Sequence, residues 1–297
     1  MGGKLPVTVV IPVYRGLSQT KACLDSVLQS KIGESDVLLV NDASPEKEIT
    51  AYCETLSKRE TVSVIKNNKN LGFVGTVNKA MEATGKRDLV LLNSDTRVSG
   101  DWLSRLQTAA YRKANIGTVT PFSNNAEICS YPQICCVNSL LEGMNEGELH
   151  GVASKVNDGL YLPIPTAVGF CMYIRRALID QVGQFDSTAF GKGYGEENDF
   201  CLRAEAAGWQ NILAADCFVY HEGGVSFSEQ KQALVANAET VIANRYPSYF
   251  DDVKKFIQQD PIRPFRDRID AEIFRRSDEA ALALWALRAQ EYLSRCN

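Results

Sequence analysis

The chain has 297 residues, of which 45% are hydrophobic and 23% are charged, and its formal net charge is −4 at pH 7. This length and composition fit a folded protein with one large α/β domain plus an appendage, or with two modest domains. The acidic balance, with no basic stretch longer than a pair such as Arg175-Arg176, argues against a nucleic-acid partner.

Nine cysteines are scattered along the chain, and none forms the Cys-x-x-Cys spacing of a structural zinc site. Most stand in apolar runs, as free thiols do in a reducing compartment. The amino-terminal MGGKLPVTVVIPVY has too short an apolar run for a signal peptide, and no apolar stretch is long enough to span a bilayer. We therefore expect a cytoplasmic protein that can also work at the inner face of the cell membrane.

Predicted strands and helices alternate in the first half of the chain. The predicted strands are β-branched runs at residues 7–13, 36–42, 62–67, 88–93 and 116–123. The helices predicted between them cover residues 18–30, 45–58, 72–84 and about 101–114. Ser18 is the expected N-cap of the first helix, and Pro45 falls in the first turn of the second. Near-continuous apolar strands between helices predict an α/β fold with a Rossmann-like, mostly parallel sheet covered on both faces.

The second half of the chain is less regular. Residues 124–165 are rich in Gly, Asn and Glu, and we expect a long functional loop with one short helix there. The elements predicted next are a strand that runs into a helix at 166–183, a helix with an acidic first turn at 195–209, and two short strands within 211–224. Beyond Phe227 the pattern predicts helices almost to the end of the chain. We therefore expect a helical C-terminal extension of residues 228–297 on a domain of residues 1–227.

Four groups of polar residues follow a predicted strand or begin a predicted helix. They are Asp42, Asn93-Ser94-Asp95, Glu196-Glu197-Asn198-Asp199 and His221. Each group alone has a structural explanation, as a helix cap, a turn, a favourable helix start or an ordinary histidine, and His150 is interpreted in this way. Together they indicate a ligand site, because ligands bind at the carboxyl ends of the strands in parallel sheets.

The chemistry of these groups predicts a class of reaction. One carboxylate and one imidazole can hold Mg²⁺ or Mn²⁺ when a phosphate ligand completes the coordination shell. A separate carboxylate at a helix start can deprotonate an incoming hydroxyl. Glycines at 191, 193, 195, 223 and 224 would allow the backbone to move around a closing site. This combination predicts the transfer of a group away from a diphosphate.

In their order and spacing, six segments resemble the inverting family 2 glycosyltransferases, which share the GT-A fold. The segments are VTVVIPVYRG, LLVNDASPE, NKNLGFVGTVNKAME, LVLLNSDTRVSGDWL, YGEENDFCLRAEAAGW and YHEGGVSF. The resemblance covers roughly residues 7–227 and implies a nucleotide-binding half of about 1–122 and an acceptor-binding half of about 123–227. The extension of residues 228–297 lies outside it.

The resemblance implies a metal and donor site. Asp95, at the last position of the DxD motif, and His221 would bind Mg²⁺ or Mn²⁺, whereas Asn93 replaces the first Asp of the motif and would make a weaker, neutral contact. Asp42 would bind the edge of uracil or thymine, and Pro12 and Tyr14 would line the base and ribose pocket. The other implied donor-site residues are Asn70, Gly72, Asn78 and Ser94.

The resemblance also implies an acceptor site and a mechanism. Glu197 would be the general base, at a position where Asp is commoner, and Glu196 and Asp199 would orient the acceptor. Gly169 and Phe170 would lie beneath the acceptor. A single displacement would invert the anomeric carbon of a UDP- or dTDP-linked hexose or rhamnose. The acceptor would be a glycan or a lipid-linked saccharide, as in bacterial polysaccharide assembly such as that of O-antigen.

Two other functions stay open. A catalytically inactive module that binds a sugar nucleotide or a glycan would tolerate Asn93, but it would not need both Glu197 and His221. A nucleotidyltransferase would want a loop rich in Gly, Arg and Lys after the first strand, where PVYRGLSQT offers only Arg15 and Lys21. The chain can also be a module of a larger polypeptide or part of an oligomer, and its acceptor can bring it to a membrane.

Overall fold

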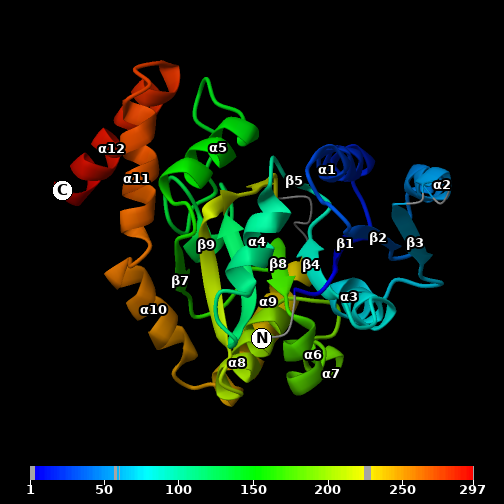
Figure 1. Cartoon of the computed structure of the whole chain (residues 1–297). Coiled ribbons are helices and arrows are strands. Elements are labelled where there is room, and N and C mark those ends of the chain that lie inside the picture. Colours follow the sequence, from blue (N-terminus) through cyan, green and yellow to red (C-terminus); the bar gives the residue numbers. More distant parts are fainter. Residues whose placement is uncertain (1–3, 57–58, 60, 224–228, 297) are drawn as a thin grey trace.

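One eight-stranded sheet forms the centre of the molecule (Figure 1). We describe it from a computed structural model, which covers residues 4–56, 59, 61–223 and 229–296. The strand order is β3-β2-β1-β4-β8-β6-β9-β7. The bounds are Val7–Val13 (β1), Asp36–Asn41 (β2), Val62–Lys66 (β3), Asp88–Leu92 (β4), Ile116–Phe122 (β6), Tyr161–Pro163 (β7), Cys171–Ile174 (β8) and Gln210–Phe218 (β9).

Most neighbouring strands in this sheet are parallel. Strands β3, β2, β1 and β4 run in one direction, and β6 pairs in parallel with β9. Strand β8 is antiparallel to both β4 and β6, and β7 is antiparallel to β9. The predicted α/β fold with a mostly parallel sheet is therefore confirmed.

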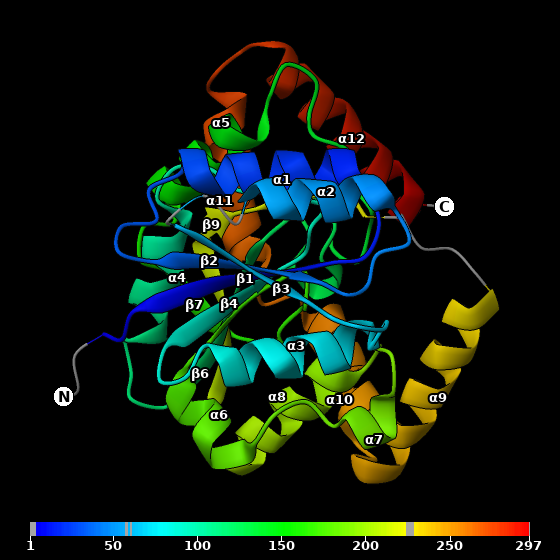
Figure 2. The same ribbon diagram turned by 90° about the vertical axis from the view of Figure 1, so that its right-hand side faces the viewer.

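Helices cover both faces of the sheet (Figure 2). One face packs on α1 (Leu17–Gln29), α2 (Lys47–Leu56) and α4 (Trp102–Ala110), and the other on α3 (Gly72–Ala83), α6 (Arg176–Val182) and α8 (Glu196–Ala206). Strand residues alternate between these two layers, as Val9 and Ile11 belong to the first hydrophobic cluster and Val10 to the second. Because both faces are covered, the strands are apolar at nearly every position.

The C-terminal helices belong to both hydrophobic layers. Helices α9 (Glu229–Arg245) and α10 (Tyr249–Gln259) contribute to the cluster of α3, α6 and α8, next to the short α7 (Ser187–Phe190). Helices α11 (Arg263–Phe274) and α12 (Glu279–Cys296) contribute to the other cluster, beside α5 (Glu146–Val156). The predicted helical extension is confirmed, whereas its predicted boundary between residues 227 and 228 lies outside the described residues.

The predicted starts or ends of several helices and strands are wrong. Ser18 does not cap α1, because the helix begins at Leu17 after Gly16, which has φ 85° and makes no side-chain cap bond. Helix α2 begins at Lys47, after Pro45, and α4 already ends at Ala110. In place of two short strands within 211–224, the chain forms the nine-residue β9 and the short β10 (Tyr220–His221). Strand β9 is longer because it pairs with β6 on one side and β7 on the other, which periodicity alone does not reveal.

The expected loop of residues 124–165 is more ordered than predicted. It contains a 3₁₀ turn (η1, Glu127–Cys129), the eleven-residue α5 and strand β7. Helix α5 begins with a capping box, in which Asn145 and Glu148 satisfy each other's backbone N–H groups. The segment is therefore a packed part of the second half of the domain.

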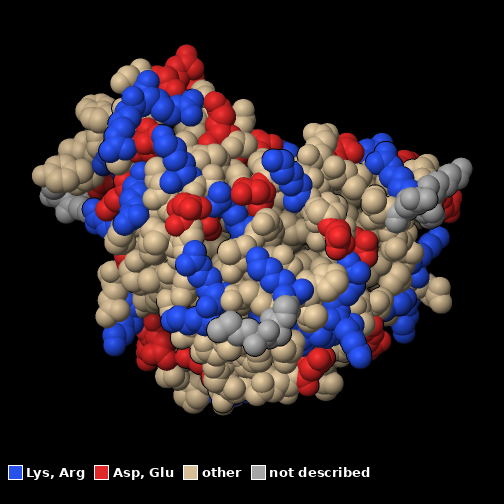
Figure 3. Space-filling model, in the orientation of Figure 1, with Lys and Arg blue, Asp and Glu red and all other residues tan. Residues whose placement is uncertain are grey.

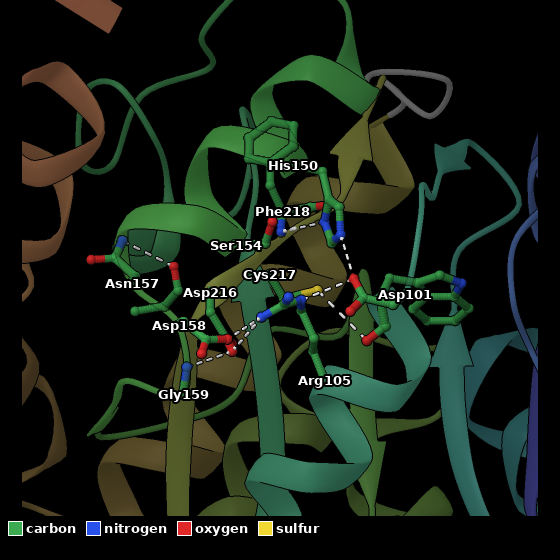
Figure 4. A network of polar contacts seen from close by, with 12 residues as sticks. Asp101, Arg105, His150, Ser154, Asn157, Asp158, Gly159, Asp216, Cys217 and Phe218 are labelled. Carbon is green, nitrogen blue, oxygen red and sulfur yellow. Dashed lines mark hydrogen bonds and ion pairs between the residues drawn. The ribbon is translucent and has the colours of Figure 1, made fainter. Parts of the chain in front are cut away.

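The other histidine, His150 on α5, lies in a polar network that joins three elements (Figure 4). Its Nε2 is 3.2 Å from Oδ1 of Asp101, the residue directly before α4, and its Nδ1 is 3.3 Å from the Phe218 backbone on β9. Arg105 then connects Asp101 to Asp158 and to Asp216 on β9. These contacts agree with the structural interpretation of His150.

Basic and acidic side chains alternate over the face of the molecule near the N-terminus (Figure 3). That pattern agrees with the small formal net charge of −4. Within the described ranges, no helix combines the length and the apolar character that crossing a membrane requires.

Candidate functional site

The site lies where the parallel strands end. Tyr14 follows β1, Asp42 follows β2 and Asn93 follows β4, so all three stand at the carboxyl edge of the sheet, on the side where α9 lies (Figure 2). A small second sheet is formed at this edge by β5 (Thr96–Arg97) and β10. In it His221 pairs with Thr96, which brings two segments that are distant in the sequence together.

Asp95 and His221 form the centre of the site. Asp95 Oδ1 lies 3.4 Å from His221 Nε2, and the two side chains are 18% and 15% exposed. The backbone N–H of Glu222 donates to the Asp95 carbonyl at 3.0 Å, which holds the two segments in register. The two predicted metal ligands are thus neighbours that ligands can reach from solvent.

The His221 ring is held in one orientation. Its Nδ1 lies 2.7 Å from the carbonyl oxygen of Asn125, so Nδ1 carries a proton and Nε2 is the ring nitrogen that faces Asp95. The Asn124 side chain bonds both backbone groups of His221, and the Phe170 ring stacks on the imidazole at 5.2 Å. In metal-binding histidines, the ring nitrogen that does not bind the metal typically donates to a backbone carbonyl in this way.

The pKa values of the pair reflect their contact. Burial by itself would raise the pKa of Asp95, but the hydrogen bond and the charge of His221 lower it below its usual range. Burial by itself would lower the pKa of His221, but the contact with Asp95 and the Asn125 carbonyl raise it. The contact therefore favours an ionised Asp95 beside a protonated His221.

The donor set fits a divalent cation that shares its shell with a phosphate. Within the described part of the chain, no group of three or more His, Cys, Asp and Glu side chains could hold a metal ion. Asp95 and His221 would therefore supply two ligands, and a diphosphate and water would supply the rest. Asn93 and Ser94 are partly exposed, and the Asn93 backbone N–H donates to the Phe170 carbonyl at 2.8 Å.

Glu197 lies close to this centre in the first turn of α8. A Cβ added to Gly169 would meet Glu197 Oε1 at 3.8 Å, so Gly169 faces the carboxylate while its neighbour Phe170 packs on His221. Burial raises the pKa of Glu197, and the charge of Glu127 in η1 raises it further, against hydrogen bonds from the backbone. This shift is what a carboxylate needs to act as a base near neutral pH.

Glu196 is more deeply buried than Glu197. It is 3% exposed, and its Oε2 has no hydrogen-bond partner among the residues that the structure covers. Burial first, and then the charge of Glu197, raise the pKa of Glu196 well above its usual value. Glu196 is therefore held in the protonated form over a wider pH range than an exposed glutamate.

We expect this buried carboxyl to make the stability of the protein depend on pH. Because the folded-state pKa lies above the unfolded one, the folded state binds more protons and the free energy of unfolding falls as pH rises through this window. The window begins near the ordinary glutamate pKa of about 4.3. We measure the free energy of unfolding with urea at pH 5 and at pH 8. Between these two pH values it is expected to fall less in Glu196→Gln than in the wild type. Equal losses in the two proteins would contradict a raised pKa of Glu196.

The Asp199 carboxylate is surrounded by protein groups. Its carboxylate has no exposed surface and accepts hydrogen bonds from Arg203, from Arg245 and from the Tyr246 hydroxyl. The role of Asp199 in orienting the acceptor stays a prediction, and these contacts mean that it would act through the residues that it holds rather than by touching the acceptor itself. Arg203, four residues further along the same helix, pairs with Asp199 at 2.8 Å.

Asp42, which follows β2, is 4% exposed, and its carboxylate faces the first backbone N–H groups of α3. It accepts hydrogen bonds from the backbone N–H groups of Leu71 and Gly72 and from the Asn67 side chain. A carboxylate has about four lone-pair positions, so roughly one remains for a ligand. Pro12 and Asn70 are partly exposed and Tyr14 is 40% exposed, so the other predicted base-pocket residues are accessible.

Gly72, the first residue of α3, packs closely against the loop before α8. It has φ 75°, and a Cβ at this position would lie 2.6 Å from the Lys192 Cα. The next residue, Phe73, donates its N–H to the Lys192 carbonyl at 2.9 Å. Only glycine allows this approach, because it has no Cβ.

Asn78 lies further along α3. Its amide donates to the Phe185 carbonyl at 2.8 Å and accepts from the Phe185 N–H at 3.1 Å. The structure thus uses Asn78 to join α3 to the segment before α7, and its predicted contact with the nucleotide has no support there.

Four residues of the site were missed in the sequence. Asn124 and Asn125 hold His221, Asn67 holds Asp42, and Glu127 acts on the pKa of Glu197. Asn124 and Asn125 follow β6 in the segment TPFSNN, so the rule that located Asp42 and Asp95 at strand ends would also have found them. Glu127 carried no such signal, because its position depends on the path of η1.

Comparisons with known sequences identify the family. Residues 8–183 match the model of the family described as Glycosyl transferase family 2. The chain is 21% identical over 250 residues to "Uncharacterized protein y4gI" of Sinorhizobium fredii, covering 76% of this chain and 25% of the relative. It is 24% identical over 104 residues to "Uncharacterized glycosyltransferase EpsJ" of Bacillus subtilis, covering 35% of this chain and 30% of the relative. The chain thus spans less than a third of the length of these relatives.

Solved structures show the same fold at low sequence identity. One is GalNAc-T7 with UDP, GalNAc and Mn²⁺, with a TM-score of 0.62, 15% identity and coverage of 90% of this chain and 54% of the other. Another is the mannosyltransferase PcManGT from Pyrobaculum calidifontis in complex with GDP-Man and Mn²⁺, with a TM-score of 0.59, 14% identity and coverage of 98% and 81%. The family model covers more than half of the chain, from β1 to the end of α6, so the chain belongs to glycosyl transferase family 2 and has the GT-A fold.

Proposed function

We propose that the chain transfers a sugar from a nucleoside-diphosphate sugar to a hydroxyl group, with inversion at the anomeric carbon. The observation that carries this proposal is the juxtaposition at Gly169-Phe170. Phe170 packs on the imidazole of the Asp95–His221 pair, and the adjacent Gly169 faces the Glu197 carboxylate. The proposed metal ligands and the proposed base thus contact two consecutive residues, which supports their acting on one substrate.

Asp95 and His221 would hold Mn²⁺ or Mg²⁺. A cation bound there supplies positive charge that stabilises a departing nucleoside diphosphate. The two solved structures, one with UDP, GalNAc and Mn²⁺ and the other with GDP-Man and Mn²⁺, support a sugar-nucleotide donor and a divalent metal. For this chain we propose a UDP- or dTDP-linked hexose or rhamnose, with the base held by Asp42, Pro12 and Tyr14.

Glu197 would take the proton of the acceptor hydroxyl. As the hydroxyl oxygen forms a bond to the anomeric carbon, the bond from that carbon to the diphosphate oxygen breaks on the opposite face. The proton moves to a Glu197 carboxylate oxygen, and a single displacement of this kind inverts the configuration. The proposed acceptor is a glycan or lipid-linked saccharide of polysaccharide assembly such as O-antigen, at the cytoplasmic face of the membrane.

The alternative is an inactive module that binds a sugar nucleotide. Asn93 favours it, because a neutral side chain replaces one acidic residue of the DxD motif. A general base would serve no purpose in such a module, whereas Glu197 combines a raised pKa with a position beside Gly169. These observations favour the enzyme over the module.

A thermal-shift screen tests nucleotide recognition. The protein is heated with UDP, dTDP, GDP or CDP, each with and without Mn²⁺. A ligand at 100 times its Kd that binds only the folded state adds about 2.7 kcal/mol of stability. We expect an Mn²⁺-dependent rise in Tm with UDP or dTDP. No shift with any of the four nucleotides would contradict the proposed donor site.

A further inference from the structure

The C-terminal helix α9 makes ionic contacts with the helix that carries Glu197. The end of α9 presents Arg245, whose Nη1 donates to Asp199 Oδ1 on α8 and whose Nη2 donates to Asp186 Oδ2, both at 2.8 Å. The next residue, Tyr246, donates its hydroxyl to the same Asp199 oxygen at 3.0 Å. Arg245 therefore bridges two carboxylates, one in the first turn of α8 and one at the start of α7.

The middle of α9 packs on the backbone directly before Glu196 and Glu197. A Cβ added to Gly195 would lie 2.9 Å from the Ala238 Cβ of α9 and 3.1 Å from the Phe190 ring. Asn237 also donates to the carbonyl of Ala189 in α7 at 3.2 Å. Helix α9 thus contacts the base-bearing helix and the segment leading to it at several points.

Arg203 completes the arrangement from within α8. Its Nε donates to Asp199 Oδ2 at 2.8 Å, and its other nitrogens donate to the carbonyls of Val182 and Gln184. Two arginines therefore balance two aspartates around a carboxylate without exposed surface. Loss of Arg245 would leave the buried Asp199 with one cation in place of two.

We propose that Arg245 is a positioning residue for the general base. By holding Asp199 and Asp186 together it fixes the first turn of α8, and with it the place of Glu197 opposite Gly169. Glu197 and Asp199 share that turn, which opens with the bond from the Asp199 N–H to the Gly195 carbonyl. A misplacement of a reacting group by about 1 Å can lower a rate about 10²-fold.

This proposal rests on the proposed function, since it takes Glu197 as the base. It adds a role for the C-terminal extension, because α8 and α9 both lie beyond the residues 8–183 that match the family model. It also assigns the effect to kcat, since the predicted nucleotide contacts come from the ends of β1, β2 and β4 and from α3, whereas the printed partners of Arg245 among the described residues belong to α8 and to the segment that opens α7.

The test compares Arg245→Met with Arg263→Met and Arg245→Lys in the full chain. Arg263 is the matched control, because among the described residues its ion pair is with the exposed Asp267 on α11, at 3.7 Å, and both side chains are more than half exposed. We expect Arg245→Met to lower kcat by about 10²-fold while the donor KM changes by less than about threefold. Arg245→Lys should recover part of the loss, since lysine keeps the charge but cannot bridge two carboxylates. Arg263→Met should match the wild type.

Hydrogen–deuterium exchange of residues 199–203 supplies a readout that does not depend on activity. Faster exchange in Arg245→Met than in Arg263→Met supports the positioning role, and equal exchange overturns it. An unchanged kcat, or equal effects on kcat from Arg245→Met and Arg263→Met, also overturns it. If Arg245→Met does not fold, Tyr246→Phe replaces it and should show the same changes to a smaller extent. A wild-type protein that cleaves no donor refutes the proposed function, and the exchange comparison then decides the positioning role separately.

Discussion

Replacing Glu197 with glutamine is expected to lower the rate of sugar transfer by about 10²–10⁴-fold, the usual contribution of a general base. Glutamine keeps the size of the side chain and its place beside Gly169 but cannot accept the proton of the acceptor hydroxyl. The affinity for the donor should stay close to that of the wild type. Steady-state kinetics and calorimetric titration with the nucleoside diphosphate measure the two effects.

Glu205→Gln is the matched control for this substitution. Glu205 lies near the end of the same helix and is exposed, so its substitution should leave kcat unchanged. In the wild type, kcat/KM should rise with pH through the raised pKa of Glu197, because the base must lose its proton before it can act. That acidic limb should disappear in Glu197→Gln. Wild-type rates in Glu197→Gln would remove Glu197 from the mechanism.

Replacing Asp95 with asparagine is expected to abolish the dependence of nucleotide binding on Mn²⁺. Loss of residues that merely support a metal ligand costs about 10–100-fold in metal affinity, and the loss of one of two protein ligands should cost more. The contacts of Asp42 with α3 are untouched, so weak metal-independent binding of the nucleotide should remain. Titrations of UDP or dTDP with and without Mn²⁺ separate the metal-dependent binding of the nucleotide from its metal-independent binding.

The control for Asp95 is Asp25→Asn, which removes an exposed carboxylate from α1 and should leave the Mn²⁺ dependence intact. His221→Ala should behave as Asp95→Asn does, because both would remove one ligand of the same ion. Different responses of the two variants would show that Asp95 and His221 do not act on one metal ion.

Much of the fold could be predicted because its signals are local. Apolar runs such as Val7–Val13 and Asp88–Leu92 are separated by amphipathic helices, and in parallel sheets this alternation indicates buried strands. The pairings of the second half are not local. Strand β8 inserts antiparallel between β4 and β6, and β9 extends through contacts with β6 and β7, so their lengths depend on partners that the local pattern does not contain.

The residues of the candidate site also divide into those with a local signal in the sequence and those whose contacts are distant in the sequence. Asp42, Asp95 and Glu197 could be located because strand ends and helix starts are visible in the sequence. The burial of Asp199 could not be predicted, because it stands in the same acidic run as Glu197, while Arg245 and Tyr246, which bond it, lie at the end of α9 and directly after it, more than forty positions further along. The pairing of the Asn78 amide with the distant Phe185 could not be predicted either, because Asn78 lies in a segment that resembles the nucleotide-covering part of the family.

The most direct test of the central claim is the release of nucleoside diphosphate from UDP- and dTDP-sugars by the purified chain, measured with and without Mn²⁺. The account predicts that the wild type releases nucleoside diphosphate from at least one of these donors in an Mn²⁺-dependent manner, and that Glu197→Gln and Asp95→Asn each suppress this release. If the wild type binds the nucleotide but releases it from no donor faster than Glu197→Gln does, the chain is a binding module and the proposed transfer is wrong.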